Sequence, residues 1–136
     1  MSSPVVTLAL WCLITIAGCG GDSGTTGPGP SSGVDRAKTL GMLTAAERAK
    51  ACDWTAERQG GYGRNVTCPD GTMQDTDRSQ ATCLEGGVMI ATLCPTLTIA
   101  DIEDCTNDVS SDLCKFATAP GCANLRKCAA QFVPGP

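Results

Sequence analysis

The chain has 136 residues, a formal net charge of −4 at neutral pH, ten cysteines, no histidine and few aromatic side chains. An acidic chain without a cluster of Lys and Arg is a poor candidate for binding nucleic acid, whose phosphates need cationic partners. The lack of histidine removes the commonest general base and the hydrolytic triads that are built on it.

An almost unbroken apolar segment runs from Val5 to Ala17. At about 1.5 Å per residue it is too short to cross a membrane core of about 30 Å, so we do not expect a spanning helix. Its length is typical of the apolar part of an export signal, which is removed from the mature protein. We therefore predict that residues 1–18 are a signal peptide.

The apolar segment ends in Ile16-Ala17-Gly18-Cys19, which resembles the lipobox of bacterial lipoproteins. The resemblance implies cleavage before Cys19 and a diacylglyceryl group on its sulfur, and Gly20 at the next position implies sorting to the outer membrane. Each buried methylene contributes about 0.8 kcal/mol, so two or three acyl chains give durable anchoring. The alternative is an ordinary secretory signal cleaved near Gly18, which would leave Cys19 as an unmodified thiol.

Residues 20–33 read GGDSGTTGPGPSSG and have no apolar side chain beyond their prolines. Such a segment cannot bury enough surface to offset the entropy cost of ordering it, so we predict a disordered tether. A flexible coil of this length spans about 20 Å. The predicted organisation is a signal peptide (1–18), a lipidated cysteine with its tether (19–33) and a cysteine-rich domain (34–133).

Eight cysteines remain once Cys12 leaves with the signal peptide and Cys19 carries lipid. An even number of cysteines in a small exported domain predicts a disulfide framework. Zinc is the competing use of cysteine, but the chain has no Cys-x-x-Cys pair and no histidine. Eight cysteines allow 105 pairings, so the connectivity stays open, although Cys122 and Cys128 should bond to other elements rather than to each other. The eight are Cys52, Cys68, Cys83, Cys94, Cys105, Cys114, Cys122 and Cys128.

A capping box predicts the first helix of the domain. Thr44 and Glu47 stand three residues apart, so each side chain can accept a hydrogen bond from the other residue's amide. The glycine pair at 60–61 predicts where this helix ends. The small residues that we expect on its packed face are Ala45, Ala49, Cys52 and Ala56.

A short hairpin is predicted after this helix. Pro69-Asp70-Gly71 has the composition of a tight turn, with short strands at 66–68 and 72–73 on its two sides.

The segment 60–64, between the first helix and the hairpin, holds one tyrosine and one arginine among three glycines, which makes it a candidate contact loop. An ordinary connector is the preferred interpretation of that segment.

A short helix at 77–85 is predicted to carry Cys83 and to stop at Gly86-Gly87. The apolar run 88–94 that follows ends before Pro95. Its length fits a helix or a strand, so the sequence leaves its structure open.

Three further helices are predicted in the last third of the domain, beginning near Thr98, Ser111 and Pro120. Their apolar spacing defines two buried faces. The first of these faces comprises Ile99, Ile102, Thr106 and Val109. The last comprises Cys122, Leu125, Ala129 and Phe132.

Together these elements predict a mainly α fold, a small disulfide-stapled bundle of short helices with a minor β-hairpin. The interior should be thin, because small domains bury a modest fraction of their surface and this one has few large side chains. Disulfides at about 2–4 kcal/mol each would supply much of the stability. The aromatic residues of the predicted domain are Trp54, Tyr62, Phe116 and Phe132.

Acidic side chains give the candidate metal sites. Asp75, Asp77 and Ser79 resemble the opening of a calcium loop, but Gln80 stands where that loop needs glycine and Gly86 where it needs glutamate. A denser run farther on could bind calcium or a cationic partner, although helix caps and a solvated helix face are preferred. We therefore expect no metal and no cofactor. The denser run comprises Asp101, Glu103, Asp104, Asp108 and Asp112.

These features favour a monomeric, non-catalytic interaction module that is lipid-anchored in the bacterial cell envelope, at the outer membrane, with an unknown protein partner. Two alternatives remain open. A compact cross-linked scaffold could be an inhibitor or a toxin-like ligand. A carboxylate-dependent hydrolase would need two acidic side chains that converge in a cleft.

Overall fold

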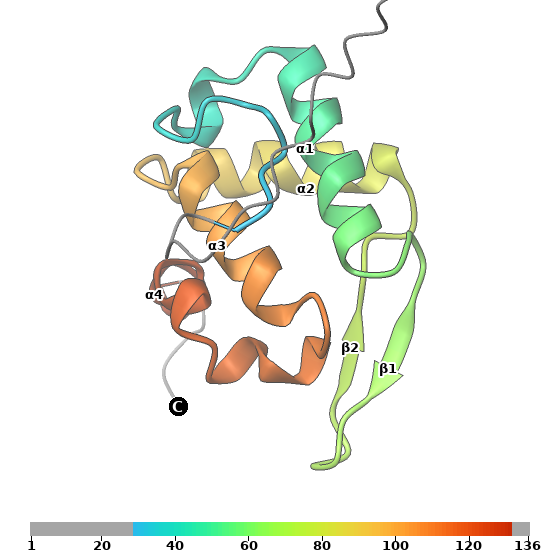
Figure 1. Cartoon of the computed structure of the whole chain (residues 1–136). Coiled ribbons are helices and arrows are strands. Elements are labelled where there is room, and N and C mark those ends of the chain that lie inside the picture. The colour runs from blue at the N-terminus through green and yellow to red at the C-terminus, as the bar shows by residue number, and fades with distance from the viewer. Residues whose placement is uncertain (1–28, 132–136) are drawn as a thin grey trace, which may run out of the picture.

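The computed structural model describes residues 29–131, so the predicted signal peptide, Cys19 and Phe132 lie outside the described residues. This part contains four α-helices, three 3-10 helices and one antiparallel hairpin, cross-linked by four disulfides. The predicted fold class is confirmed. In Figure 1 the helices gather together, and the hairpin projects at the lower right. No helix within residues 29–131 is long and apolar enough to cross a membrane.

Helix α1 (Ala45–Arg58) begins at the predicted capping box. The Glu47 amide donates to the Thr44 hydroxyl at 3.2 Å, and the Thr44 amide donates to the Glu47 carboxylate at 2.9 Å. The helix ends before Gly60, whose φ of +89° lies in the left-handed region that glycine adopts readily. On the predicted packed face, Cys52 and Ala56 are buried, Ala49 is half-buried and Ala45, at the exposed first position, faces solvent.

Strands β1 (Asn65–Thr67) and β2 (Met73–Asp75) form the predicted hairpin, with Val66 opposite Gln74. The Asp70 carboxylate accepts the amide of the second residue after it at 2.9 Å, which closes the turn. The predicted hairpin is confirmed. It could be predicted because the sequence signals of a hairpin lie within a single turn.

Helix α2 (Gln80–Leu93) corrects the prediction of a helix that stops at Gly86-Gly87. The helix continues through both glycines and takes in the apolar run that the sequence left open. Glycine costs a helix interior about 1 kcal/mol relative to alanine, and tertiary contacts can override such a preference. Here disulfides at Cys83 and Cys94 fix α2 on both sides of the glycine pair.

Helix α3 (Ile99–Val109) begins at a second capping box, formed by Thr98 and Asp101. Its predicted buried face is confirmed at three positions, and Ile102 is half-buried. The 3-10 helix η2 (Leu113–Ala117) follows in the segment where a short helix was predicted.

The last predicted helix is divided into the 3-10 helix η3 (Pro120–Cys122) and helix α4 (Ala123–Ala130). Cys122 is fully buried and Leu125 half-buried, as predicted, but Ala129 is exposed. The prediction assumed one continuous α-helical period. A 3-10 helix has three residues per turn instead of 3.6, which shifts the positions that face inward.

The packed part begins earlier than predicted. Ser31 and Ser32 were assigned to the tether, yet Ser32 is buried and both hydroxyls donate to Glu103, at 3.0 and 2.7 Å. The composition of residues 20–33 gave no sign of this contact, because Glu103 lies more than seventy residues farther along the chain.

Two small clusters form the apolar interior of the described residues. One gathers around the start of α3, and the other around its end. None of the aromatic residues that the structure describes is buried, so the interior is as thin as predicted. The first cluster comprises Val34, Leu40, Leu43, Cys94, Leu97 and Ile99, and the second Cys105, Val109, Leu113, Ala119 and Cys122.

Four disulfides connect the elements to one another. One joins α1 to α2, one joins the end of β1 to η2, one joins the end of α2 to α4, and one joins α3 to η3. Cys122 and Cys128 bond to other elements, as expected. The pairs are Cys52–Cys83, Cys68–Cys114, Cys94–Cys128 and Cys105–Cys122.

Candidate ligand-binding cavity

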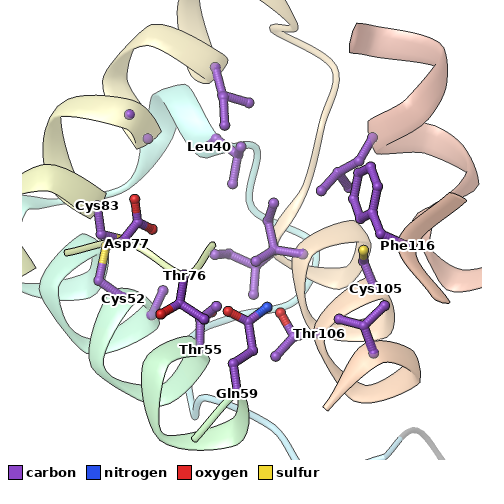
Figure 2. A pocket seen from close by; sticks show the side chains of 18 of the residues that line it. Leu40, Cys52, Thr55, Gln59, Thr76, Asp77, Cys83, Cys105, Thr106 and Phe116 are labelled. Atoms are coloured by element: carbon purple, nitrogen blue, oxygen red, sulfur yellow. A yellow bond between two sulfur atoms is a disulfide. The ribbon is translucent and has the colours of Figure 1, made fainter. Parts of the chain in front are cut away.

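A cavity of about 460 Å³ lies between α1, α2 and α3 (Figure 2). Protein interiors are close-packed and contain few voids larger than a water molecule. This cavity is much larger than such voids, and it is partly open at the surface. It falls within the range of about 300–1,000 Å³ that is typical of small-molecule sites.

Apolar side chains from six elements form most of the cavity wall. In Figure 2, Asp77 and Cys83 lie on one side of the cavity, and Cys105 and Phe116 on the other. The wall therefore spans the space between the α1–α2 disulfide and the second apolar cluster. Its larger aliphatic members are Leu40, Leu43, Ile90, Ile99, Ile102, Val109, Leu113 and Leu125.

The glycine pair of α2 also lines the cavity. A methyl group added at either Gly86 or Gly87 would meet no atom within 4 Å. Alanine would therefore fit at both positions, and it would favour the helix by about 1 kcal/mol at each. The absence of both side chains leaves the backbone of α2 open to the empty space.

Polar groups occupy part of the wall. Thr55 and Gln59 come from α1, Thr106 comes from α3, and Arg48 brings a guanidinium from the first turn of α1. Pockets of this kind use a few polar groups in an apolar lining to orient a ligand.

Two carboxylates, Asp75 and Asp77, lie at the wall where β2 leads toward α2. Burial raises the pKa of Asp77. The third member of the calcium-like pattern, Ser79, is instead the N-cap of α2 and accepts the Thr82 amide at 3.2 Å. Within residues 29–131, no group of three or more His, Cys, Asp or Glu side chains is placed to hold a metal ion.

Most members of the denser acidic run have structural roles. Asp101 and Asp112 cap α3 and η2, in agreement with the preferred interpretation. Asp108 accepts the Gly121 amide at 2.7 Å and so ties α3 to η3.

Glu103 corrects the expectation of a solvated face. Its side chain is only 1% exposed. One carboxylate oxygen accepts the Ser32 amide and hydroxyl, both at 2.7 Å, and the other accepts from Arg36 at 2.6 Å. A buried charge requires partners of this kind. The apolar spacing of α3 did not predict the burial of Glu103, because the N-terminal segment, which lies far away in the sequence, covers this carboxylate.

The segment 60–64 follows α1, and its two larger side chains make local hydrogen bonds. The Tyr62 hydroxyl donates to Asp53 at 2.9 Å, and the Arg64 guanidinium donates to the Gln59 carbonyl at 2.8 Å. Burial and the hydrogen bond to Asp53 raise the pKa of Tyr62 to about 12. Both side chains are thus tied to α1 or to the residue that caps its C-terminal end.

Comparison with known proteins assigns no family to the chain. No protein-family model, no curated protein and no solved structure matches it. The functional interpretation therefore depends on the cavity, the disulfide framework and the sequence features of the N-terminus.

Sequence reasoning missed the cavity, because a void is formed jointly by elements that are distant along the chain. Gly86-Gly87 was interpreted as the end of a helix, and no sequence feature singled out Arg48. The available signal was a glycine pair directly followed by an apolar run without turn residues. That pattern fits a continuous helix with a gap on one face.

Proposed function

We propose that this protein is a non-catalytic binding module that takes a small apolar ligand into the cavity between α1, α2 and α3. The cavity carries the proposal, with its volume of about 460 Å³ and its mostly apolar wall. Atoms that line a void lack contact partners on one side. An apolar ligand would supply those contacts, and removal of its own surface from water would favour binding.

The proposed location is the bacterial cell envelope, with the domain exported as a monomer and held at the outer membrane by lipid on Cys19. The resemblance of residues 16–19 to a lipobox supports the anchor. The four disulfides support export, because such bonds persist in oxidising compartments. A protein partner of unknown identity would receive or supply the ligand.

Binding of a fluorescent apolar probe, N-phenyl-1-naphthylamine, tests the cavity. We expect saturable binding to the oxidised protein and competition by 1-dodecanol. Gly87→Leu should weaken probe binding at least about tenfold, or 1.4 kcal/mol, because the new side chain would occupy the cavity. Thr92→Leu is the matched control, since it adds leucine at an exposed position of the same helix.

Two results would contradict the proposal. One is the absence of saturable probe binding to the oxidised protein. The other is equal probe affinity of the Gly87→Leu and Thr92→Leu variants, provided that circular dichroism shows both to be folded.

Mass spectrometry of protein extracted from bacterial membranes tests the anchor. The expected mature N-terminus is Cys19, with a mass increase that matches a diacylglyceryl group. An intact Met1, or an unmodified Cys19 in the membrane fraction, would overturn the lipid anchor and leave the cavity proposal standing.

A carboxylate-dependent hydrolase is the alternative with an observation in its favour. Asp75 and Asp77 both lie at the cavity wall, and a carboxyl group with a raised pKa near a second carboxylate suits general acid catalysis. Turnover of ester or glycoside model substrates that is lost in Asp77→Asn would favour this alternative over a binding module.

A further inference from the structure

We infer that the ligand of the cavity is a single-chain anionic amphiphile whose head group pairs with Arg48. The inference rests on the proposed function and adds the chemical class of the ligand. It is carried by the surroundings of the one guanidinium in a mostly apolar wall.

Arg48 has incomplete hydrogen bonding. Its Nη2 donates to the Leu43 carbonyl at 3.0 Å. Its Nε is buried and has no hydrogen-bond partner among the residues that the structure describes. A buried donor without a partner costs about 1–3 kcal/mol, and more when the group is charged. Because Nε has almost no accessible surface, it does not face the cavity, and a ligand would accept from the accessible edge of the guanidinium instead.

Arg48 also lacks an anionic partner. The ion pairs within residues 29–131 join Arg36 to Glu103 and Asp104, and Lys38 to Glu47. The neighbouring Glu47 is therefore already engaged, with Lys38 at 2.5 Å and with the capping amide. The first turn of a helix favours an anion over a cation, so an incoming anion would gain from both the guanidinium and the helix dipole.

The carboxylates of the wall come from β2 and the segment after it. Thr76, which lies between them in the chain, donates its hydroxyl to the Gly61 carbonyl at 2.9 Å and so lies beside the segment that follows α1. Asp77 lies near the Cys52–Cys83 disulfide in Figure 2.

The wall thus combines one cation that has no counter-ion among residues 29–131 with two carboxylates from the β2 side and a mostly apolar remainder. Opposite charges attract, so an anionic head group belongs at Arg48 and an alkyl chain along the apolar wall. Carboxylate and phosphate groups share the oxygen acceptors that a guanidinium binds.

The test compares three twelve-carbon ligands at pH 8: dodecanoate, dodecyl phosphate and 1-dodecanol, each displacing the fluorescent probe. We expect the anions to bind the wild-type protein about tenfold more tightly than the alcohol, the factor that 1.4 kcal/mol of a charge-assisted hydrogen bond provides. Arg48→Met should remove this preference, so that the anions and the alcohol bind with similar affinity, whereas Arg48→Lys should retain part of it. The stronger anion identifies the head group as a carboxylate or a phosphate.

Each outcome separates the two proposals. Equal binding of anion and alcohol to the wild-type protein would overturn the inference about Arg48 and leave the apolar site intact. Failure of all three ligands to bind would overturn the proposed function. If Arg48→Met does not fold, the wild-type protein provides the test through the NMR chemical shift of the Arg48 Nε–H group. A change of this shift on addition of dodecanoate but not of 1-dodecanol supports the inference. Binding of dodecanoate with no shift overturns it.

Discussion

At the scale of single residues, Glu103 shows how this small domain accommodates a buried charge. Its carboxylate accepts from Ser31, Ser32 and Arg36, so both oxygens have partners. These contacts join the N-terminal segment to α3. The side chain of Arg36 is 27% exposed, so one partner keeps contact with water while Glu103 does not.

Glu103→Ala should destabilise the domain by about 3 kcal/mol, because removal of one partner from a buried pair strands the remaining polar groups. Chemical denaturation under oxidising conditions measures this loss. Glu85→Ala is the control, since Glu85 is exposed on α2 and should change stability by less than about 0.5 kcal/mol. Equal stability of the two variants would show that the Glu103 contacts do not contribute.

The capping box of α1 predicts a dependence of stability on pH. The hydrogen bond from Lys38, followed by that from the Thr44 amide, lowers the pKa of Glu47 from 4.5 to about 2. A carboxylate whose pKa is lowered on folding stabilises the fold above its usual pKa, and this contribution is lost as pH falls from 4.5 toward 2.

The wild-type protein should therefore lose its stability advantage over Glu47→Gln across that acidic range. Thermal unfolding of both proteins at a series of pH values measures the difference, and an NMR titration gives the pKa directly. A difference that stays constant from pH 6 to pH 2 would contradict the assignment.

At the scale of elements, α2 is the part of the fold that local signals described least well. Capping boxes at Thr44 and Thr98 were readable because their partners lie three residues away. The continuation of α2 through its glycine pair could not be predicted from the sequence, because disulfides to α1 and α4 override the local preference of glycine.

Gly86→Ala should raise stability by about 1 kcal/mol, because alanine is a better helix former and its methyl group would meet no atom within 4 Å. Chemical denaturation of the oxidised protein measures the change. A loss of stability of similar size would mean that the space beside Gly86 is not empty. Gly41→Ala is the control, because Gly41 lies outside the α-helices and a methyl group added there would also meet no atom within 4 Å.

Contacts between distant segments explain what else the sequence could not reveal. The composition of residues 20–33 predicted a tether, and only the fold shows that Glu103 holds its last serines. The cavity likewise has no linear motif, since its wall combines Arg48, Gly87, Ile102 and Phe116 from separate elements. The disulfide framework was predictable because it follows from the number of cysteines, whereas the pairing required the fold.

At the scale of the whole molecule, the disulfides provide what the thin interior does not. Each α-helix that contributes to the cavity wall is cross-linked to another element. Bridges of about 2–4 kcal/mol each are comparable with the net stability of about 5–15 kcal/mol of a typical domain. Without these cross-links the helices would be expected to close the apolar cavity. The disulfides can therefore keep it open.

The position of a bound apolar chain is the most direct test of the cavity as the binding site. Isotope-filtered NMR of the oxidised protein with 1-dodecanol should give contacts from the alkyl chain to the methyl groups of Ile90, Ile102 and Val109, which line the cavity. Contacts confined to the exposed methionines Met42 and Met89, or none at all, would contradict a ligand site between α1, α2 and α3.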